Sequence, residues 1–184
     1  MNKFAKAFHN SSKDLIDVRA FREQWNLTQP DLALLMPGKY TEQDVAAWEL
    51  TVKRIPTSLL KYLHDMGNEL QGQVDRTVSN ILNIAAEHIP AEVDAKAFVR
   101  LVCYTELEDL LESDIMMGRL GLPGLSLHAA ITRHVAEDLA RHDISANFIY
   151  FDAASYKQWA ESYQGKPTHE AWAMEQKLGQ YSLQ

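Results

Sequence analysis

Three side chains that could ligate a metal ion are spaced four residues apart along one stretch of the chain. His134, Asp138 and His142 would lie on one face of a helix, and imidazole and carboxylate groups are common metal ligands. The apolar residues that would pack this helix lie close to the same face, and no distant ligand completes a known motif. We therefore expect these residues to have a structural or interface role. We also expect no metal and no other cofactor.

The side chains that could act in nucleophilic catalysis lack the neighbouring residues of known catalytic motifs. Cys103 lies inside residues 97–104, which are predicted to form a buried strand, where a thiol is usually inert. Ser126 and His128 are near each other but lack the GxSxG elbow of hydrolases. The glycine-rich residues 118–124 lack the Lys-Ser/Thr of a phosphate-binding loop. We expect the protein not to be an enzyme.

The polar side chains between Leu27 and Pro56 would be held by two short helices. Thr28 is placed to cap the first helix. Pro37-Gly38 ends that pattern, and Thr41 followed by Asp44 is typical of the start of a second helix. The apolar residues expected to face inward are Leu32, Ala33, Leu35, Val45 and Trp48.

This stretch resembles the helix-turn-helix of the lambda-repressor-like (Cro/CI, or Xre-type) DNA-binding domains. The family pattern is LTQxxLA, a short turn, a helix ending in a large apolar residue and Glu, and a basic segment followed by Pro. The resemblance covers about residues 18–66; the turn from Met36 to Lys39 is longer than usual, and the second helix carries Glu42 and Asp44. The matching positions are Leu27-Thr28-Gln29, Leu32-Ala33, Trp48-Glu49, Lys53-Arg54 and Pro56.

The resemblance implies a DNA-binding site. In the family, the residue matching Gln29 bonds a phosphate, and the start of the second helix contacts bases in the major groove. Lys53 and Arg54 would neutralise backbone phosphates. The partner implied is double-stranded DNA, bound by a homodimer. The residues expected to contact DNA are Thr28, Gln29, Lys39, Tyr40, Thr41, Glu42, Gln43, Lys53 and Arg54.

Charge is distributed unevenly along the chain, which has 184 residues and a net charge of −7. Residues 1–64 hold 9 Lys/Arg and 7 Asp/Glu, a balance of +2, whereas residues 65–184 hold 9 and 18, a balance of −9. From this difference we expect the N-terminal part to contact DNA. We expect the rest of the chain to dimerise or to contact a protein partner. The start of the chain lacks a signal-peptide core, and no apolar run approaches the ~20 residues of a membrane span. We expect a cytoplasmic protein that does not associate with membranes.

Further helices are expected on both sides of the Leu27–Pro56 stretch. The first runs from Asp14 to Trp25 and leaves Arg22 for solvent. After the stretch, a helix over residues 57–65 is expected to end near Gly67, followed by a second helix to residue 89. The apolar stripe of that second helix would pack on its own domain or pair with a second copy of the chain.

The last part of the sequence changes from helical to mixed periodicity. The predicted order is a strand at 97–104, a helix capped by Thr105 with Leu111 and Ile115 inward, a loop at 118–124, a helix from Ser126 to His142, a strand at 147–151, and helices at 153–163 and 168–178. The fold class expected is mainly α. A lambda-repressor-like helical bundle (residues 1–66) precedes a connecting helix (67–89) and an acidic α+β domain (90–184) with about two strands.

These features predict a transcriptional repressor that binds operator DNA as a homodimer through the helix-turn-helix. The alternative is a protein-interaction adaptor or antitoxin-like protein that uses the helical bundle without specific DNA binding.

Overall fold

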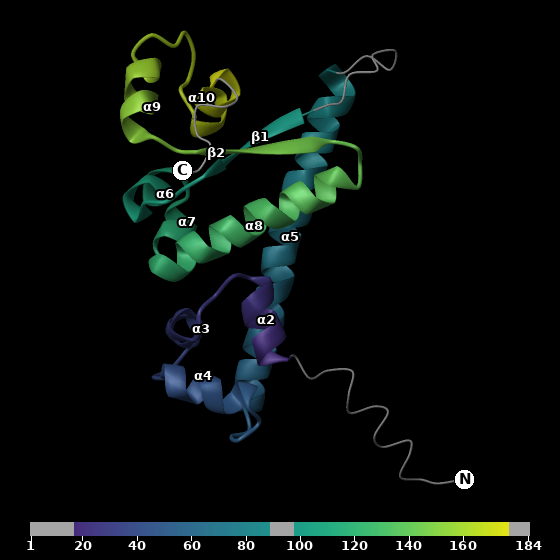
Figure 1. The fold of residues 1–184 in the computed structure, drawn as a ribbon, viewed down its shortest axis with the longest axis vertical. Coiled ribbons are helices and arrows are strands. Elements are labelled where there is room, and N and C mark those ends of the chain that lie inside the picture. Colours follow the sequence, from purple (N-terminus) through teal and green to yellow (C-terminus); the bar gives the residue numbers. More distant parts are fainter. Residues whose placement is uncertain (1–16, 89–97, 177–184) are drawn as a thin grey trace, which may run out of the picture. The chain divides into compact units, whose positions relative to one another are not determined.

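The computed structural model describes residues 17–88 and 98–176 (Figure 1). In these residues the chain is mainly helical and has a small parallel sheet of two strands. Contacts divide the chain into two units, the first ending at Glu69 and the second beginning at Leu70. This division falls within one helix, three residues beyond the limit expected at residue 66. The predicted helix start at Asp14, the expected boundary at residues 89–90 and the predicted end at Leu178 lie outside the described residues.

The first unit contains α2 (Val18–Gln24), α3 (Gln29–Leu35), α4 (Glu42–Glu49) and the beginning of α5 (Thr57–His88). The predicted caps of α3 and α4 are confirmed. Thr28 accepts a hydrogen bond from the backbone N–H of Asp31, whose carboxylate accepts one from the Thr28 N–H. Thr41 and Asp44 form the same capping box at α4. Each box satisfies N–H groups that the first helical turn leaves unpaired.

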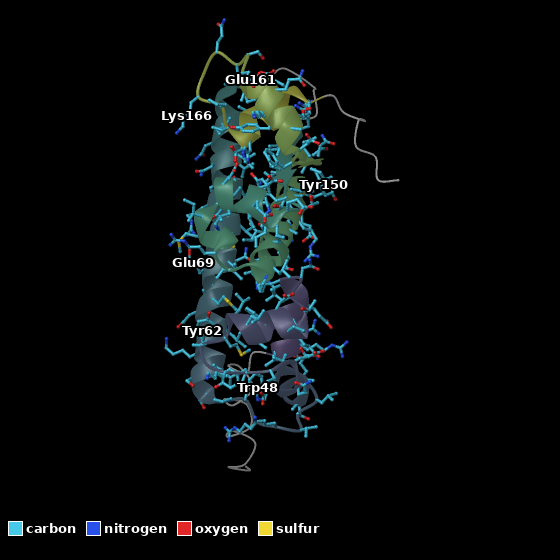
Figure 2. The ribbon with its side chains drawn as sticks, turned by 90° about the vertical axis from the view of Figure 1, so that its left-hand side faces the viewer. Trp48, Tyr62, Glu69, Tyr150, Glu161 and Lys166 are labelled. Carbon is cyan, nitrogen blue, oxygen red and sulfur yellow. The ribbon has the colours of Figure 1, made fainter. Side chains whose placement is uncertain are left out.

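The core of the first unit is formed by apolar residues from all its helices. Val45 is fully buried and Trp48 is 5% exposed, so the predicted inward face of α4 is confirmed. Leu32 and Ala33 of α3 are also buried, whereas Leu35 is half-buried. Trp48 and Tyr62 are labelled in Figure 2; the Tyr62 hydroxyl donates to the carbonyl of Leu35 at 2.8 Å and so ties α5 to the end of α3. The complete set of buried apolar residues is Val18, Phe21, Trp25, Leu27, Leu32, Ala33, Met36, Val45, Trp48, Leu59 and Leu63.

The long helix α5 is continuous from Thr57 to His88, so the predicted break near Gly67 is wrong. A Cβ added to Gly67 would lie 3.3 Å from Cε2 of Phe21, which shows that the helix backbone passes close to that ring. Glycine in a helix interior costs only about 1 kcal/mol relative to alanine, which packing on both sides of this position offsets. Leu70, Val74 and Val78 are buried within the chain, as expected for packing on its own domain.

In the second unit, β1 (Phe98–Cys103) and β2 (Ser145–Tyr150) pair in parallel, with Phe98 opposite Ser145 and Cys103 opposite Tyr150. Parallel strands require a long crossover, which here consists of α6 (Leu107–Ser113), α7 (Ile115–Gly118) and α8 (Leu122–Ala140). After β2 come α9 (Ala153–Ala160) and α10 (His169–Glu175), which are capped by Asp152 and Thr168. α8 packs against both strands, and α10 packs against β1 (Figure 1).

Two predictions for the crossover are wrong at its start. α6 begins at Leu107 after Glu106, so Thr105 is not its cap. A second short helix then follows, because the Asp114 carboxylate accepts hydrogen bonds from the N–H groups of Met116 and Met117. This change of direction leaves Leu111 and Ile115 exposed by 42% and 56%, rather than inward.

The loop predicted at residues 118–124 is present but shorter, at residues 119–121, because α7 ends at Gly118 and α8 begins at Leu122 instead of Ser126. α8 ends at Ala140 instead of His142. Gly121 has a φ of +70°, which turns the chain into the helix at a conformation that glycine adopts readily. Pro123 lies in the first turn, where its missing N–H costs little. Gly124 is needed because an added Cβ would lie 2.0 Å from the carbonyl oxygen of Met117. α9 likewise ends early, at Ala160 instead of Tyr163.

Among residues 17–88 and 98–176, no helix is long and apolar enough to span a bilayer.

Candidate functional site

The beginning of α4 carries three of the nine polar residues expected to contact DNA. Thr41, Glu42 and Gln43 are exposed at the beginning of the helix, while Val45 and Trp48 anchor its opposite face in the core. Gln43 lies on the side of the helix opposite Val45 and Trp48, as helical periodicity requires, whereas Thr41 and Glu42 are exposed at the first turn. The N-terminus of a helix also carries a partial positive charge, which favours a nearby anion.

Tyr40 and Lys39 precede this helix and differ in their surroundings. The Tyr40 ring packs edge-on against Trp48, with ring centroids 5.2 Å apart, so it is half-buried. Gly38 permits this contact: its φ is +132°, and an added Cβ would lie 2.8 Å from Cε2 of Tyr40. Lys39 is exposed. Tyr40 thus supports the helix more than it presents a free polar group.

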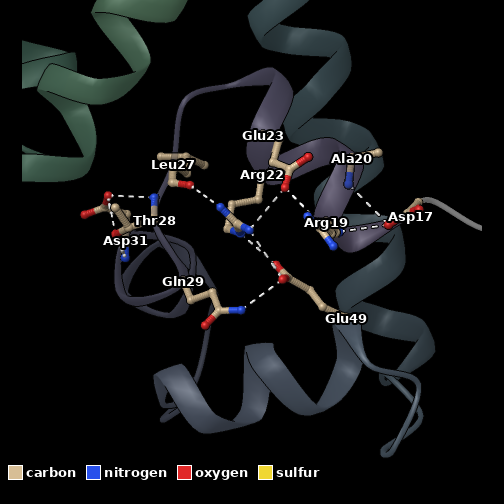
Figure 3. Close-up of polar contacts among 10 residues, drawn as sticks. All are labelled: Asp17, Arg19, Ala20, Arg22, Glu23, Leu27, Thr28, Gln29, Asp31 and Glu49. Atoms are coloured by element: carbon tan, nitrogen blue, oxygen red, sulfur yellow. Dashed lines mark hydrogen bonds and ion pairs between the residues drawn. The ribbon is translucent and has the colours of Figure 1, made fainter.

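An ion pair between Arg22 and Glu49 joins the end of α4 to α2 (Figure 3). Arg22 Nε donates to Glu49 Oε1 at 2.7 Å, and its Nη1 donates to the Leu27 carbonyl at 2.9 Å. The side chains are 17% and 7% exposed, so the prediction that Arg22 faces solvent is wrong. The partners are 27 residues apart in sequence, and helical spacing alone could not have paired them.

Gln29 completes this cluster from the first turn of α3. Its Nε2 donates to Glu49 Oε2 at 2.9 Å (Figure 3). One amide hydrogen of the residue expected to bond a phosphate is therefore directed to the protein. The Arg22–Glu49–Gln29 cluster connects α2, α3 and α4, and it sets where α4 lies relative to the start of α3.

Hydrogen bonds keep this cluster charged. Burial by itself would raise the pKa of Glu49, but the hydrogen bonds from Arg22 and Gln29 outweigh burial and hold the pKa below its usual value. The hydrogen bond to Glu49 likewise raises the pKa of Arg22. Both groups are ionised at neutral pH, and their opposite charges compensate each other within the protein.

The acid Asp44 also has its charge compensated inside the protein. Lys53 Nζ lies 2.7 Å from Asp44 Oδ1, and Asp44 also accepts the Thr41 N–H. The hydrogen bond from Lys53, together with those from Thr41, lowers the pKa of Asp44. The carboxylate of α4 that remains exposed without such a pairing is Glu42.

Two cations beside α4 differ from Lys53 in that their positive charges are not paired with a carboxylate of the described residues. Lys39 and Arg54 are exposed and make no ion pair within the described part of the chain. Their positive charges are free to meet an anion, whereas Lys53 would first have to leave Asp44. Among the described residues of this region, the exposed charges without an ion pair are thus Lys39, Arg54 and Glu42.

The metal candidates on α8 do not form a site. His134 Nδ1 lies 3.3 Å from Glu137 Oε2, Asp138 pairs with Arg141, and His142 lies beyond the end of the helix. In the described ranges, no group of three or more His, Cys, Asp or Glu side chains could hold a metal ion.

The nucleophile candidates are no better placed. Cys103 is half-buried in β1, and burial raises the pKa of its thiol to about 11, which leaves almost no thiolate at neutral pH. Ser126 and His128 both lie in α8. Their positions two residues apart on a helix point their side chains to different faces.

A comparison of the sequence with models of protein families and with curated proteins found no match.

Proposed function

We propose that this protein is a DNA-binding transcriptional repressor of the lambda-repressor-like type, which binds operator DNA as a homodimer. The observation that carries the proposal is the arrangement around α4. Its capped start exposes Glu42 and Gln43, its other face is anchored by Val45 and Trp48, and its end is held by Glu49. Three of the motif residues that resemble the family take part in this arrangement: Trp48 anchors the helix, and Gln29 donates to Glu49 at its end.

The exposed groups have chemistry that suits a major groove. A glutamine such as Gln43 can bond to N6 and N7 of adenine, and a carboxylate such as Glu42 can accept from N4 of cytosine. Lys39 and Arg54 can neutralise phosphates without giving up an internal partner. In a dimer, two such helices would enter successive major grooves about 34 Å apart and block access to a promoter.

Selection of DNA from a random pool at ~100 mM salt tests this function, because salt concentration determines affinity. We expect enrichment of one sequence arranged as an inverted repeat, as a symmetric dimer requires. If no sequence is enriched and no DNA is retarded even at low salt, the proposal fails.

The variant Gln43→Ala is expected to relax base preference at one position of each half-site. A lost bidentate contact weakens binding to the selected sequence by about 10-fold, with much less effect on random DNA. The matched control is Gln71→Ala, which removes an exposed α5 amide bonded to Asp75. Equal losses on selected and random DNA would contradict a base-reading role for Gln43.

The variant Arg54→Ala is expected to weaken binding to all sequences alike and to reduce the slope of log affinity against log salt by about 1. The control is Lys61→Ala, an exposed cation of the same unit that pairs with Asp65. Lys53→Ala should also weaken binding, since it leaves the Asp44 charge uncompensated near phosphates. An unchanged salt slope for Arg54→Ala would remove this residue from the interface.

The second candidate function is protein contact through the helical bundle. It is favoured by three apolar side chains of the first unit, Leu34, Leu50 and Val52, which are exposed by 75%, 71% and 79%. Exposed apolar side chains mark an interaction surface where they form a contiguous patch. Failure of the DNA selection, with a dimer or complex that is lost in Leu50→Asp, would favour this function.

A further inference from the structure

The second unit contains a cavity of about 960 Å³. It is lined by the later part of α5, β1, α7, α8 and residues of α10, and its walls are mostly apolar. Small-molecule sites have volumes of roughly 300–1,000 Å³ and similar apolar walls with a few polar groups. The aliphatic walls include Ile81, Ile84, Leu101, Ile131, Val135 and Ile144.

Arg100 of β1 brings a permanent positive charge to this apolar lining. Its Nη1 donates to the backbone carbonyls of Ala173 and Met174 at the end of α10. Its Nε is buried and has no hydrogen-bond partner among the described residues, where Arg100 also makes no ion pair. A buried donor without an acceptor is costly, so an acceptor supplied by a ligand would be stabilised at this position.

In the described lining, one side chain besides Arg100 could bear a positive charge, His128, and it does not compete with Arg100 for an anion. Burial lowers the pKa of His128 despite Asp114 and Glu170 nearby, so this imidazole is neutral at pH 7. The Thr132 hydroxyl donates to the backbone carbonyl of His128 at 2.8 Å. Within the described lining, Arg100 is the permanent cation.

The carboxylates of the lining are engaged or hydrated. Asp114 accepts the N–H groups of Met116 and Met117 as the cap of α7. Glu112 and Glu170 are exposed to solvent. Their charges are screened by water, so they oppose an anion less than the half-buried Arg100 attracts it.

We propose that this cavity binds an apolar monocarboxylic acid, with its carboxylate on Arg100 and its hydrocarbon chain among the aliphatic side chains. The buried Nε–H selects an acceptor, the guanidinium charge selects an anion, and the walls select an apolar body. The proposal concerns the second unit only and holds whether or not the first unit binds DNA.

Calorimetric titration of the full chain with hexanoate, octanoate and decanoate tests the proposal. Affinity should rise with each added CH₂, by at most about fourfold. Decanol and decylamine share the chain of decanoate and differ in the head group. We expect decanoate to bind at least about tenfold more tightly than decanol, and decylamine to bind most weakly. Equal binding of the acid and the alcohol, or tightest binding of the amine, would overturn the proposal.

Two variants locate the ligand. Arg100→Gln should lower decanoate affinity to that of decanol without changing decanol binding. Thr77→Trp fills the cavity from α5 and should abolish both, whereas Ser79→Trp, at an exposed position of the same helix, should leave both intact. Undiminished binding to Thr77→Trp would overturn the location.

Because Arg100 also holds α10, the thermal unfolding of each variant is recorded. If Arg100→Gln does not fold, the comparison of decanoate, decanol and decylamine on the unaltered protein still tests the preference for a carboxylate. The Thr77→Trp result still tests whether the ligand lies in the cavity.

Discussion

At the scale of single residues, Glu49 connects three helices of the first unit. It receives hydrogen bonds from Arg22 and Gln29, and its side chain is 7% exposed. A buried carboxylate is stable only when its charge and lone pairs are compensated, which these two partners do. Loss of the charge would leave the largely buried Arg22 guanidinium with the more distant and exposed Glu23, at 3.7 Å, as its counter-ion.

We expect Glu49→Gln to lower the free energy of unfolding by about 2–3 kcal/mol, since removing one partner of a buried ion pair is strongly destabilising. Urea denaturation followed by tryptophan fluorescence measures the change. The control is Asp65→Asn, whose carboxylate pairs with Lys61 in solvent and should have a much smaller effect.

The same variant gives a pH test. The folded-state pKa of Glu49 lies below the unfolded value of about 4.3, so the ion pair contributes its full stability above that pH. As the pH falls through the lowered pKa, the difference between the original protein and Glu49→Gln should shrink. A difference independent of pH would show that lost packing, not lost charge, causes the effect.

At the scale of elements, the start of α8 depends on a close approach between backbones. Gly124 lies in the helix where an added Cβ would be 2.0 Å from the Met117 carbonyl oxygen. Gly72 of α5 provides a contrast, because its nearest neighbour would be the flexible end of Arg76, at 3.3 Å. The two glycines have the same helical backbone but different surroundings.

Gly124→Ala should therefore destabilise the second unit by about 3 kcal/mol or more, since α7 and α8 must separate. Gly72→Ala should be neutral or stabilising by up to about 1 kcal/mol, because alanine is the better helix former. Thermal unfolding of both variants measures the contrast. Equal effects would mean that helix propensity, and not the contact with Met117, determines the outcome.

At the scale of the whole molecule, the two units share the continuous helix α5 but have separate cores. The first core contains Trp25 and Trp48, and the second contains Trp172. Local opening depends on the contacts within each cooperative unit.

Hydrogen exchange measured by mass spectrometry should show this division. Glu49→Gln is expected to raise exchange in α2, α3 and α4 and to leave β1 and β2 protected, because its contacts lie in the first unit. Gly124→Ala should show the opposite pattern. Equal increases in both units for either variant would mean that α5 joins them into one cooperative unit.

Sequence by itself determined the features that depend on short-range contacts. Thr28 and Thr41 were predicted at the starts of helices, and each accepts a hydrogen bond from an N–H three residues later. Such bonds form wherever a helix begins, so residue type and spacing are sufficient to predict them. The inward positions of Val45 and Trp48 and the presence of two strands follow from periodicity in the same way.

Tertiary structure alone decided what depends on residues far apart in the chain. Gly67 and Gly124 were expected to interrupt helices because glycine is a poor helix former, yet both are helical positions that need a small residue beside a neighbour. The pairings of Glu49 with Arg22 and of Lys53 with Asp44 require helices to meet. The cavity beside Arg100 joins residues of several elements, since packing and not sequence order creates an enclosed space.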